Sequence, residues 1–135
     1  MDAKIPTPFT FATSHTASAV WADGLRDFFQ YRDLGISGAT HGKFNAHVIR
    51  VKKPVEQFPH TGPHTHALDF QMFFVLKGWI KFVYENHGEH LFEAGDSCLQ
   101  PPGIVHDESD CSEDLELIEF TSPARFETHL QKAVE

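Results

Sequence analysis

Two histidines separated by a single residue are the feature that most constrains this chain. His64 and His66 follow a loop rich in proline, residues 53–63, and come just before an apolar run that begins at Gln71. In an extended strand the side chains alternate between two faces, so both imidazoles point the same way. A third histidine, together with an amide oxygen, would complete a half-built coordination sphere of the kind that leaves positions open for a substrate. The residues therefore predict a metal site of His64, His66, Gln71 and His106.

The alternative is a site without metal, in which the same side chains hydrogen-bond a ligand or one another. Three buried imidazoles are costly if they become charged, and a metal ion resolves this because it accepts the lone pairs of neutral rings. A metal site is therefore the preferred interpretation.

Short apolar runs separated by turn signals predict an all-β fold. Glycine-containing turns at 77–78, 86–88, 94–96 and 101–103 punctuate the later part of the chain. Short strands at such spacing, with no long helical period, are typical of a β-sandwich or a β-barrel. Strands are expected over residues 25–32, 44–52, 71–77, 79–85, 89–93, 97–100 and 115–121.

The chain divides into three regions. Residues 1–20 combine prolines with many small polar residues and predict an irregular N-terminal arm. Residues 21–122 form the β-barrel. A short C-terminal helix is expected over residues 123–135, because Ser122 can cap it and a proline occupies the first helical position.

Composition narrows the class of protein. A chain of 135 residues with 41% hydrophobic residues has enough apolar surface for one core. The formal net charge of -8 argues against nucleic acid or an anionic membrane as a partner, since both need a basic face. No run is long and apolar enough for a membrane span, and no signal peptide is visible, so a cytoplasmic protein is expected. Cys98 and Cys111 are predicted to be free thiols.

The strand at 71–77 is apolar on both faces. Gln71, Phe73 and Val75 face one way, and the three residues between and after them face the other. A single-domain sheet has one inner face, so the second apolar face needs a cover. A homodimer is the simplest solution. The alternatives are that the N-terminal arm or the C-terminal helix covers this face.

The acidic residues after His106 are expected to form a solvated loop, because they lack the regular oxygen spacing and the glycine of a calcium loop. Among the other histidines, His47 and His60 are the candidates for a general base near the metal. Each is more simply explained as a hydrogen-bonded or solvated residue.

Two motifs connect these observations. The first is H-x-H-x4-Q-x6-G, from His64 to Gly78, and the second is G-x5-P-x-G-x2-H, from Gly95 to His106. The pair closely resembles the two motifs of the cupin superfamily, in particular its small bacterial single-domain members. This resemblance implies an antiparallel jelly roll, also called a double-stranded β-helix, with one metal held by residues of both motifs.

The chain departs from the family pattern at three positions. The usual glycine before the first motif is Phe58, and the asparagine often found after the last histidine is Asp110. More importantly, the usual glutamate ligand is Gln71, which offers a carbonyl oxygen but no negative charge. A divalent ion held only by neutral ligands keeps its full charge, so its open positions favour an anionic or enolisable chelating ligand.

The resemblance implies a metalloenzyme with dioxygenase-like chemistry on a small bidentate oxygen substrate, using Fe, Mn, Ni, Cu or Zn. An isomerase, lyase or cyclase acting on an enolisable carbonyl compound is the first alternative, and a non-catalytic module that binds a metal or a small ligand is the second. Phe73, Phe82 and either Trp79 or Ile80 are expected to line an apolar pocket suited to a small molecule.

Overall fold

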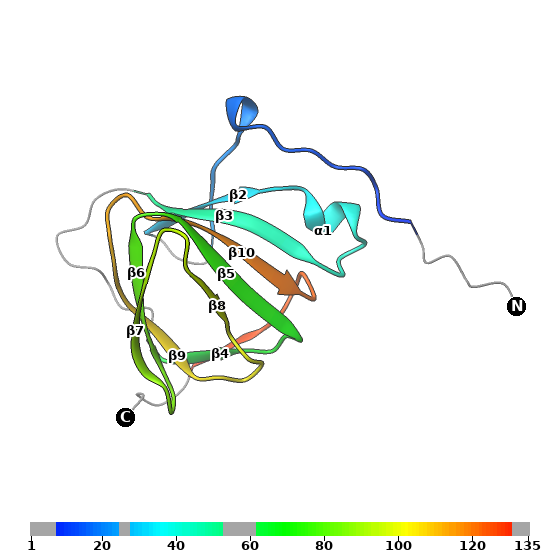
Figure 1. Ribbon diagram of the computed structural model, residues 1–135. Coiled ribbons are helices and arrows are strands. Elements are labelled where there is room, and N and C mark those ends of the chain that lie inside the picture. Colours follow the sequence, from blue (N-terminus) through cyan, green and yellow to red (C-terminus); the bar gives the residue numbers. More distant parts are fainter. Residues whose placement is uncertain (1–7, 25–27, 53–61, 131–135) are drawn as a thin grey trace, which may run out of the picture.

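Two antiparallel sheets face each other in the computed structural model, which describes residues 8–24, 28–52 and 62–130 (Figure 1). The six-stranded sheet has the order β1 (Ala22–Asp23), β2 (Phe29–Asp33), β3 (Asn45–Val51), β10 (Glu116–Ser122), β5 (Phe70–Lys77) and β8 (Ser97–Leu99). The five-stranded sheet has the order β11 (Thr128–Leu130), β4 (His64–His66), β9 (His106–Cys111), β6 (Trp79–Tyr84) and β7 (Gly88–Glu93). A short 3-10 turn, η1 (Thr16–Ser18), and the one-turn helix α1 (Ile36–Ala39) precede β3. The predicted all-β class is confirmed.

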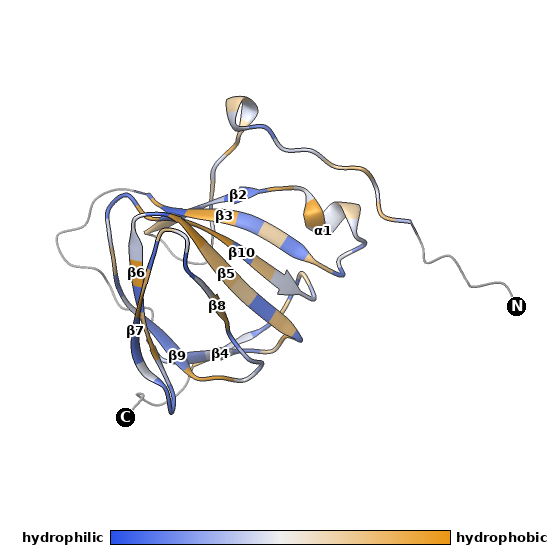
Figure 2. Ribbon diagram, viewed as in Figure 1, coloured by the Kyte–Doolittle hydropathy of each residue, from blue (hydrophilic) through white to orange (hydrophobic). Residues whose placement is uncertain are grey.

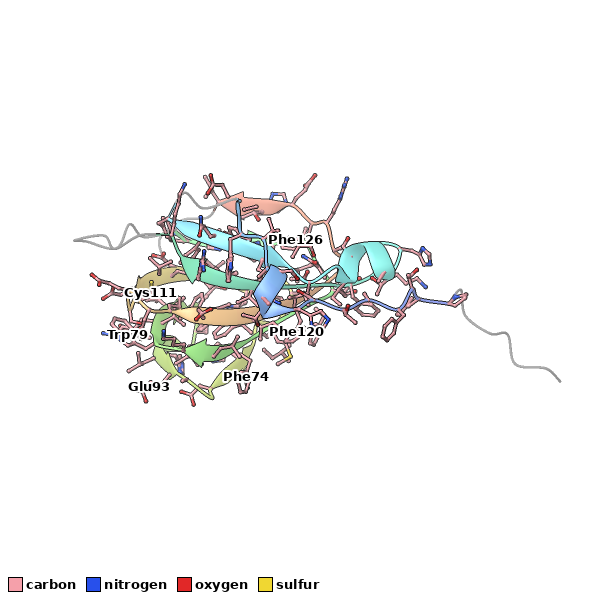
Figure 3. The ribbon with its side chains drawn as sticks, turned by 90° about the horizontal axis from the view of Figure 1, so that it is seen from above. Phe74, Trp79, Glu93, Cys111, Phe120 and Phe126 are labelled. Atoms are coloured by element: carbon pink, nitrogen blue, oxygen red, sulfur yellow. The ribbon has the colours of Figure 1, made fainter. Side chains whose placement is uncertain are left out.

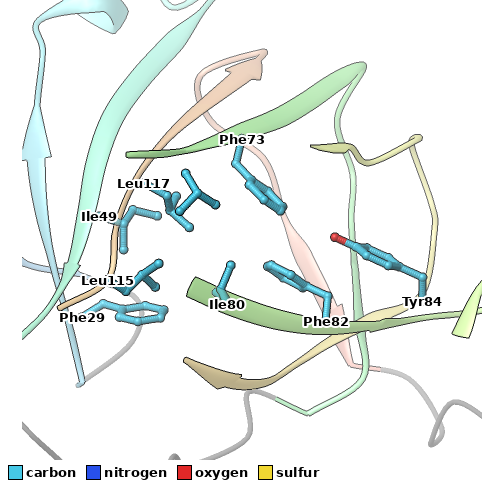
Figure 4. Close-up of a cluster of buried hydrophobic side chains, with 9 residues drawn as sticks. Phe29, Ile49, Phe73, Ile80, Phe82, Tyr84, Leu115 and Leu117 are labelled. Carbon is cyan, nitrogen blue, oxygen red and sulfur yellow. The ribbon is translucent and has the colours of Figure 1, made fainter. Parts of the chain in front are cut away.

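An aromatic core joins the two sheets. Phe73 on β5 stacks on Phe82 of β6 at a ring-centroid distance of 5.1 Å, and Phe82 stacks in turn on Tyr84 at 5.4 Å (Figure 4). Such pairs contribute about 0.5–1.5 kcal/mol each beyond the area that they bury. The aliphatic side chains Val75, Ile80, Leu115 and Leu117 fill the rest of this layer.

The period of two decides which side chains enter this core. On β5, Gln71, Phe73 and Val75 are buried, as the alternation predicts. Figure 2 shows that β5 is largely hydrophobic, whereas β4 and β9 carry mostly hydrophilic residues. Apolar side chains of β5 and β10, such as Val75 and Leu117, thus belong to the core, and the polar strands β4 and β9 carry the three histidines described below.

The opposite face of β5 leaves apolar side chains exposed. Phe74 is 39% exposed and Leu76 is 50% exposed, and Phe120 lies on the neighbouring strand β10 (Figure 3). An apolar groove of about 530 Å³, lined by Phe70, Met72 and Phe120 among others, runs across this face. Nothing within the described residues covers it.

The N-terminal arm contacts the sheet at one edge. The backbone N–H of Thr10 donates to the carbonyl of Ala39, and the ring of Phe9 packs edge-on against Phe44 at 6.2 Å. Phe11, by contrast, is 91% exposed. The described part of the arm is therefore anchored near α1 and does not cover the face of β5.

The prediction of a helix from residue 123 is wrong for the residues that the structure describes. Residues 123–127 form a bend and an irregular segment, and Thr128–Leu130 form the strand β11, which pairs antiparallel with β4. Strand β4 otherwise shares a single registered pair with β9, so its outer edge needs hydrogen-bonding partners. The pairing with β4 outweighs the weak helical signal. Residues 131–135 lie outside the described part.

The prediction of a solvated loop after His106 is wrong for residues 107–111, although Glu113 and Asp114 are exposed in the turn that follows. His106–Cys111 form β9, which lies between β4 and β6 in the five-stranded sheet. The register pairs Tyr84 with His106 and Phe82 with Glu108, with an irregularity between Lys81 and Phe82. Acidic residues have low strand propensity, but tertiary pairing overrides this preference in the middle of a sheet.

The other predicted strands agree with the structure to within a few residues at each end. The strand expected at 25–32 is β2, which begins at Phe29; residues 25–27 lie outside the described part. Most of the segment predicted as a loop, residues 53–63 with Phe58 and His60, also lies outside it.

Candidate metal centre

Three histidines converge between β4 and β9. His64 and His66 lie two residues apart on β4, so both rings project to the same side. His106 is the first residue of β9 and is the antiparallel partner of His64. One potential ligand atom from each of the three rings lies within 4.8 Å of the others. His64 and His106 are almost completely buried, at 1% and 2% exposure.

The hydrogen bonds of these rings suit a metal. Nδ1 of His64 lies 2.6 Å from the carbonyl oxygen of Gly62, and Nδ1 of His106 lies 3.0 Å from that of Ile104. A carbonyl oxygen only accepts, so Nδ1 carries the proton in both rings and Nε2 keeps its lone pair. Nδ1 of His66 has Thr128 Oγ1 as its partner at 2.9 Å. Metal-binding histidines are held by outer partners in this way, so the donor set fits a transition metal.

Gln71 is the fourth predicted ligand, and it lines the same cavity as His64 and His66. It begins the buried face of β5 and is 4% exposed. Its Nε2 donates a hydrogen bond of 3.0 Å to Oε2 of Glu119 on β10. The structure thus brings Gln71 to the site, with a carboxylate directly behind its amide group.

Glu119 also binds His47. Nε2 of His47, on β3, lies 2.8 Å from Oε1 of Glu119, and each side chain is 21% exposed. Burial alone would raise the pKa of Glu119, but the hydrogen bonds from His47 and from the N–H of Gln71 hold this pKa below its ordinary value. Glu119 is therefore ionised at neutral pH. Since a carboxylate only accepts, Nε2 of His47 is the donor, and Nδ1 is the nitrogen that can take up a proton.

A cavity of about 770 Å³ opens over these groups. Phe29, Tyr31, Ile49 and Phe126 give it apolar walls, and His47 and Arg125 add polar groups. Arg125 is exposed and makes no ion pair with any residue in the described part. A volume of this size is typical of pockets that bind small molecules.

The apolar lining differs in part from the prediction. Phe73, Ile80 and Phe82 line a small inner cavity of about 40 Å³ beside His106 and do not reach the walls of the large one. Of the two alternatives at the start of β6, Ile80 is the inward residue, at 1% exposure. The walls of the large cavity come from strands β2 and β3 and from the segment before β11.

Two residues of the site escaped the sequence analysis. Glu108 lines both cavities and lies two residues after His106, on the same face of β9. Glu119 lies two residues after the buried Leu117 on β10. In both cases the alternation of side chains along a strand could have indicated that the glutamate faces the barrel interior. For Glu108 this signal was missed because a loop was expected there.

Comparison with known proteins agrees with this geometry. A family model for the cupin domain matches residues 54–120. The structure resembles KdgF from Halomonas sp., with a TM-score of 0.68 and 19% identity over 86% of this chain and 96% of that chain. It also resembles an RmlC-like cupin from Shewanella frigidimarina, with a TM-score of 0.65 and 20% identity over 88% of this chain and 96% of that chain.

A third similar structure is the polyketide cyclase RemF from Streptomyces resistomycificus, with a TM-score of 0.72 and 14% identity over 93% of this chain and 89% of that chain. No curated protein sequence matches the chain. In the described part, no helix is long and apolar enough to cross a membrane. The matched family model shows that the chain carries a cupin domain, which spans both motifs and the three histidines, and the similar solved structures share its fold.

Proposed function

We propose that this cupin is a metal-dependent enzyme that moves a proton on a small, oxygen-chelating carbonyl compound, as isomerases, lyases and cyclases do. The observation that carries the proposal is the His47–Glu119 pair in the same cavity as His64 and His66 of the histidine cluster. Chemistry of this type needs a titratable group beside the metal, and His47 meets that need.

His64, His66, Gln71 and His106 are the residues that would hold the metal, which is one of Fe, Mn, Ni, Cu or Zn. A bound divalent ion would polarise the substrate carbonyl and stabilise the negative charge that develops when a carbon-bound proton is removed. His47 accepts that proton at Nδ1. Glu119 keeps the other ring nitrogen protonated and stabilises the imidazolium that results, as a carboxylate does in other His–carboxylate pairs.

The substrate is expected to be a small anion with an apolar body. All four proposed ligands are neutral, so the metal keeps its full charge for an anionic or enolisable oxygen pair. Arg125 on the cavity wall suits a second negative group. The aromatic walls offer apolar surface and leave room for a ring or a short chain.

Dioxygenase-like chemistry is the second candidate, because a three-histidine donor set with open positions equally suits a redox-active ion. It uses the same metal centre but gives His47 no role. The fold does not choose between the two, since one barrel supports many reactions.

The deciding experiment follows both reactions in one assay. Metal-loaded protein is incubated in D2O with a panel of small 2-oxo acids and 1,3-dicarbonyl compounds, and hydrogen exchange is followed by NMR while oxygen uptake is recorded. We expect exchange without oxygen uptake, and a loss of about 10²–10⁴-fold in His47→Gln. His90→Gln, on the exposed strand β7, is the matched control. Oxygen uptake that survives in His47→Gln would favour the dioxygenase. If neither hydrogen exchange nor oxygen uptake is found, the chain is a non-catalytic binding module and the proposal is wrong.

We also propose that a second copy of the chain covers the apolar face of β5 and β10. The support is the exposed apolar surface around Phe74 and the groove beside it. Monomeric proteins rarely expose continuous apolar surface of this extent.

A further inference from the structure

Strand β10 places one carboxylate between two polar partners. Glu119 lies opposite His47 on β3 and opposite Phe73 on β5. Each carboxylate oxygen of Glu119 accepts one hydrogen bond: Oε1 accepts from His47 at 2.8 Å, and Oε2 accepts from Gln71 at 3.0 Å. Both hydrogen bonds run across strands of one rigid sheet, so the geometry does not depend on a loop.

This contact determines which way the amide of Gln71 is turned. An amide group has a donor side and an acceptor side, whereas an ionised carboxylate offers acceptors only. The nitrogen of Gln71 must therefore face Glu119. Its Oε1 makes no hydrogen bond to any described residue and is the atom left for the cavity that Gln71 shares with His64 and His66.

The hydrogen bond between Gln71 and Glu119 also brings a negative charge close to the proposed metal ligands. Three neutral imidazoles and an amide oxygen bring no negative charge to a divalent ion. Glu119 is a carboxylate directly behind the amide, one hydrogen bond away from it, while Glu108 lines the same cavity. A hydrogen bond from the amide nitrogen to a carboxylate polarises the amide group and makes its oxygen a better donor to a cation.

We propose that Glu119 is a positioning residue for the metal centre: it holds Gln71 with the carbonyl oxygen toward the three histidines and provides the negative charge that the ligands lack. This inference rests on the metal-binding part of the proposed function. Gln71 and Glu119 together thus replace a single carboxylate ligand, with the charge moved from β5 to the neighbouring strand.

The test exchanges the two side chains. In Glu119→Gln the charge is lost and the new amide can turn either face toward Gln71, so we expect Co(II) affinity to fall about 10–100-fold and the absorption spectrum of bound Co(II) to change. In the double variant Gln71→Glu with Glu119→Gln, the amide at 119 can accept from His47 and donate to the carboxylate at 71. We expect this exchange to restore the affinity to within a few-fold.

Glu116→Gln is the matched control, since Glu116 lies on the same strand and outside the cavity lining. Equal affinity and an unchanged spectrum in Glu119→Gln would overturn the inference, as would failure of the exchange to restore binding. If Glu119→Gln does not fold, the double variant still decides, because it keeps every hydrogen bond of the network. A wild-type chain that binds no Co(II) would instead contradict the metal centre itself, and this inference with it.

Discussion

Gln71 and Glu119 lie on adjacent antiparallel strands and share a hydrogen bond of 3.0 Å inside the barrel. In the usual cupin motif, the position of Gln71 holds a glutamate that serves as a metal ligand. In this chain the carboxylate is instead Glu119, on the neighbouring strand β10. A second contact, from His47, makes Glu119 common to the proposed metal site and to the wall of the large cavity. One side chain therefore connects the proposed ligands with the proposed base.

The hydroxyl of Thr128 is expected to support metal binding through His66. Thr128→Val keeps the shape of the side chain but removes the partner of Nδ1 at 2.9 Å. The ring of His66 then loses its fixed orientation, and we expect metal affinity to fall about 10-fold. Thr65→Val is the control, because Thr65 alternates to the other face of β4. A chelator competition titration measures both variants, and equal affinities would show that the hydroxyl has no such role.

Gly78 is expected to be far less tolerant of substitution than Gly88. Both have a positive φ, +74° and +76°, so an alanine at either position costs about 1–2 kcal/mol in backbone strain. At Gly78 the added Cβ would also lie 3.0 Å from Cα of Leu115, whereas at Gly88 it would meet nothing within 4 Å. Overpacking of this kind costs about 1–3 kcal/mol more. Urea denaturation of Gly78→Ala and Gly88→Ala measures the difference, and equal losses would contradict the close approach.

The thiol of Cys111 is expected to react slowly in the folded protein. Burial, together with Glu108 and Asp110, raises its pKa from 9.0 to about 12. Burial also raises the pKa of Cys98. The thiolate is the reactive form, so at pH 8 almost none is present in the native state. Alkylation with iodoacetamide should be slow for native protein and fast in denaturant, and equal rates would be inconsistent with the buried environment.

The chain is expected to dimerise through the face of β5 and β10. Light scattering after size exclusion should give twice the chain mass of 15.3 kDa. Phe74→Glu places a charge in the middle of this face and should produce a monomer. Leu91→Glu, at a residue that is 49% exposed on β7 of the other sheet, should leave the dimer intact. A wild-type monomer at every concentration tested would contradict the proposal.

The convergence of the three histidines was predictable from strand alternation for His64 and His66, and from the family resemblance of the second motif for His106. Alternation places His64 and His66 on one face, and the second motif returns His106 to the same place. The buried face of β5 follows from the same rule. These features follow from local periodicity and from the resemblance of the second motif.

The missed features depend on pairing between distant segments. Strand β9 is acidic and looks like a loop, and only its place between β4 and β6 keeps it extended. Strand β11 forms because β4 offers a free edge to it. The role of Glu119 needed the cross-strand register, which pairs it with His47 across β3 and β10. No local pattern contains that register.

The most direct test of this account is the metal content of the purified protein. Plasma mass spectrometry of the untagged chain, prepared without chelator, should find close to one divalent transition metal per chain. His64→Ala and His106→Ala should lose it, while His90→Ala should retain it. A wild-type chain that holds no metal even after incubation with an excess, or one whose metal survives both substitutions, would contradict the assignment of the three histidines as a metal centre.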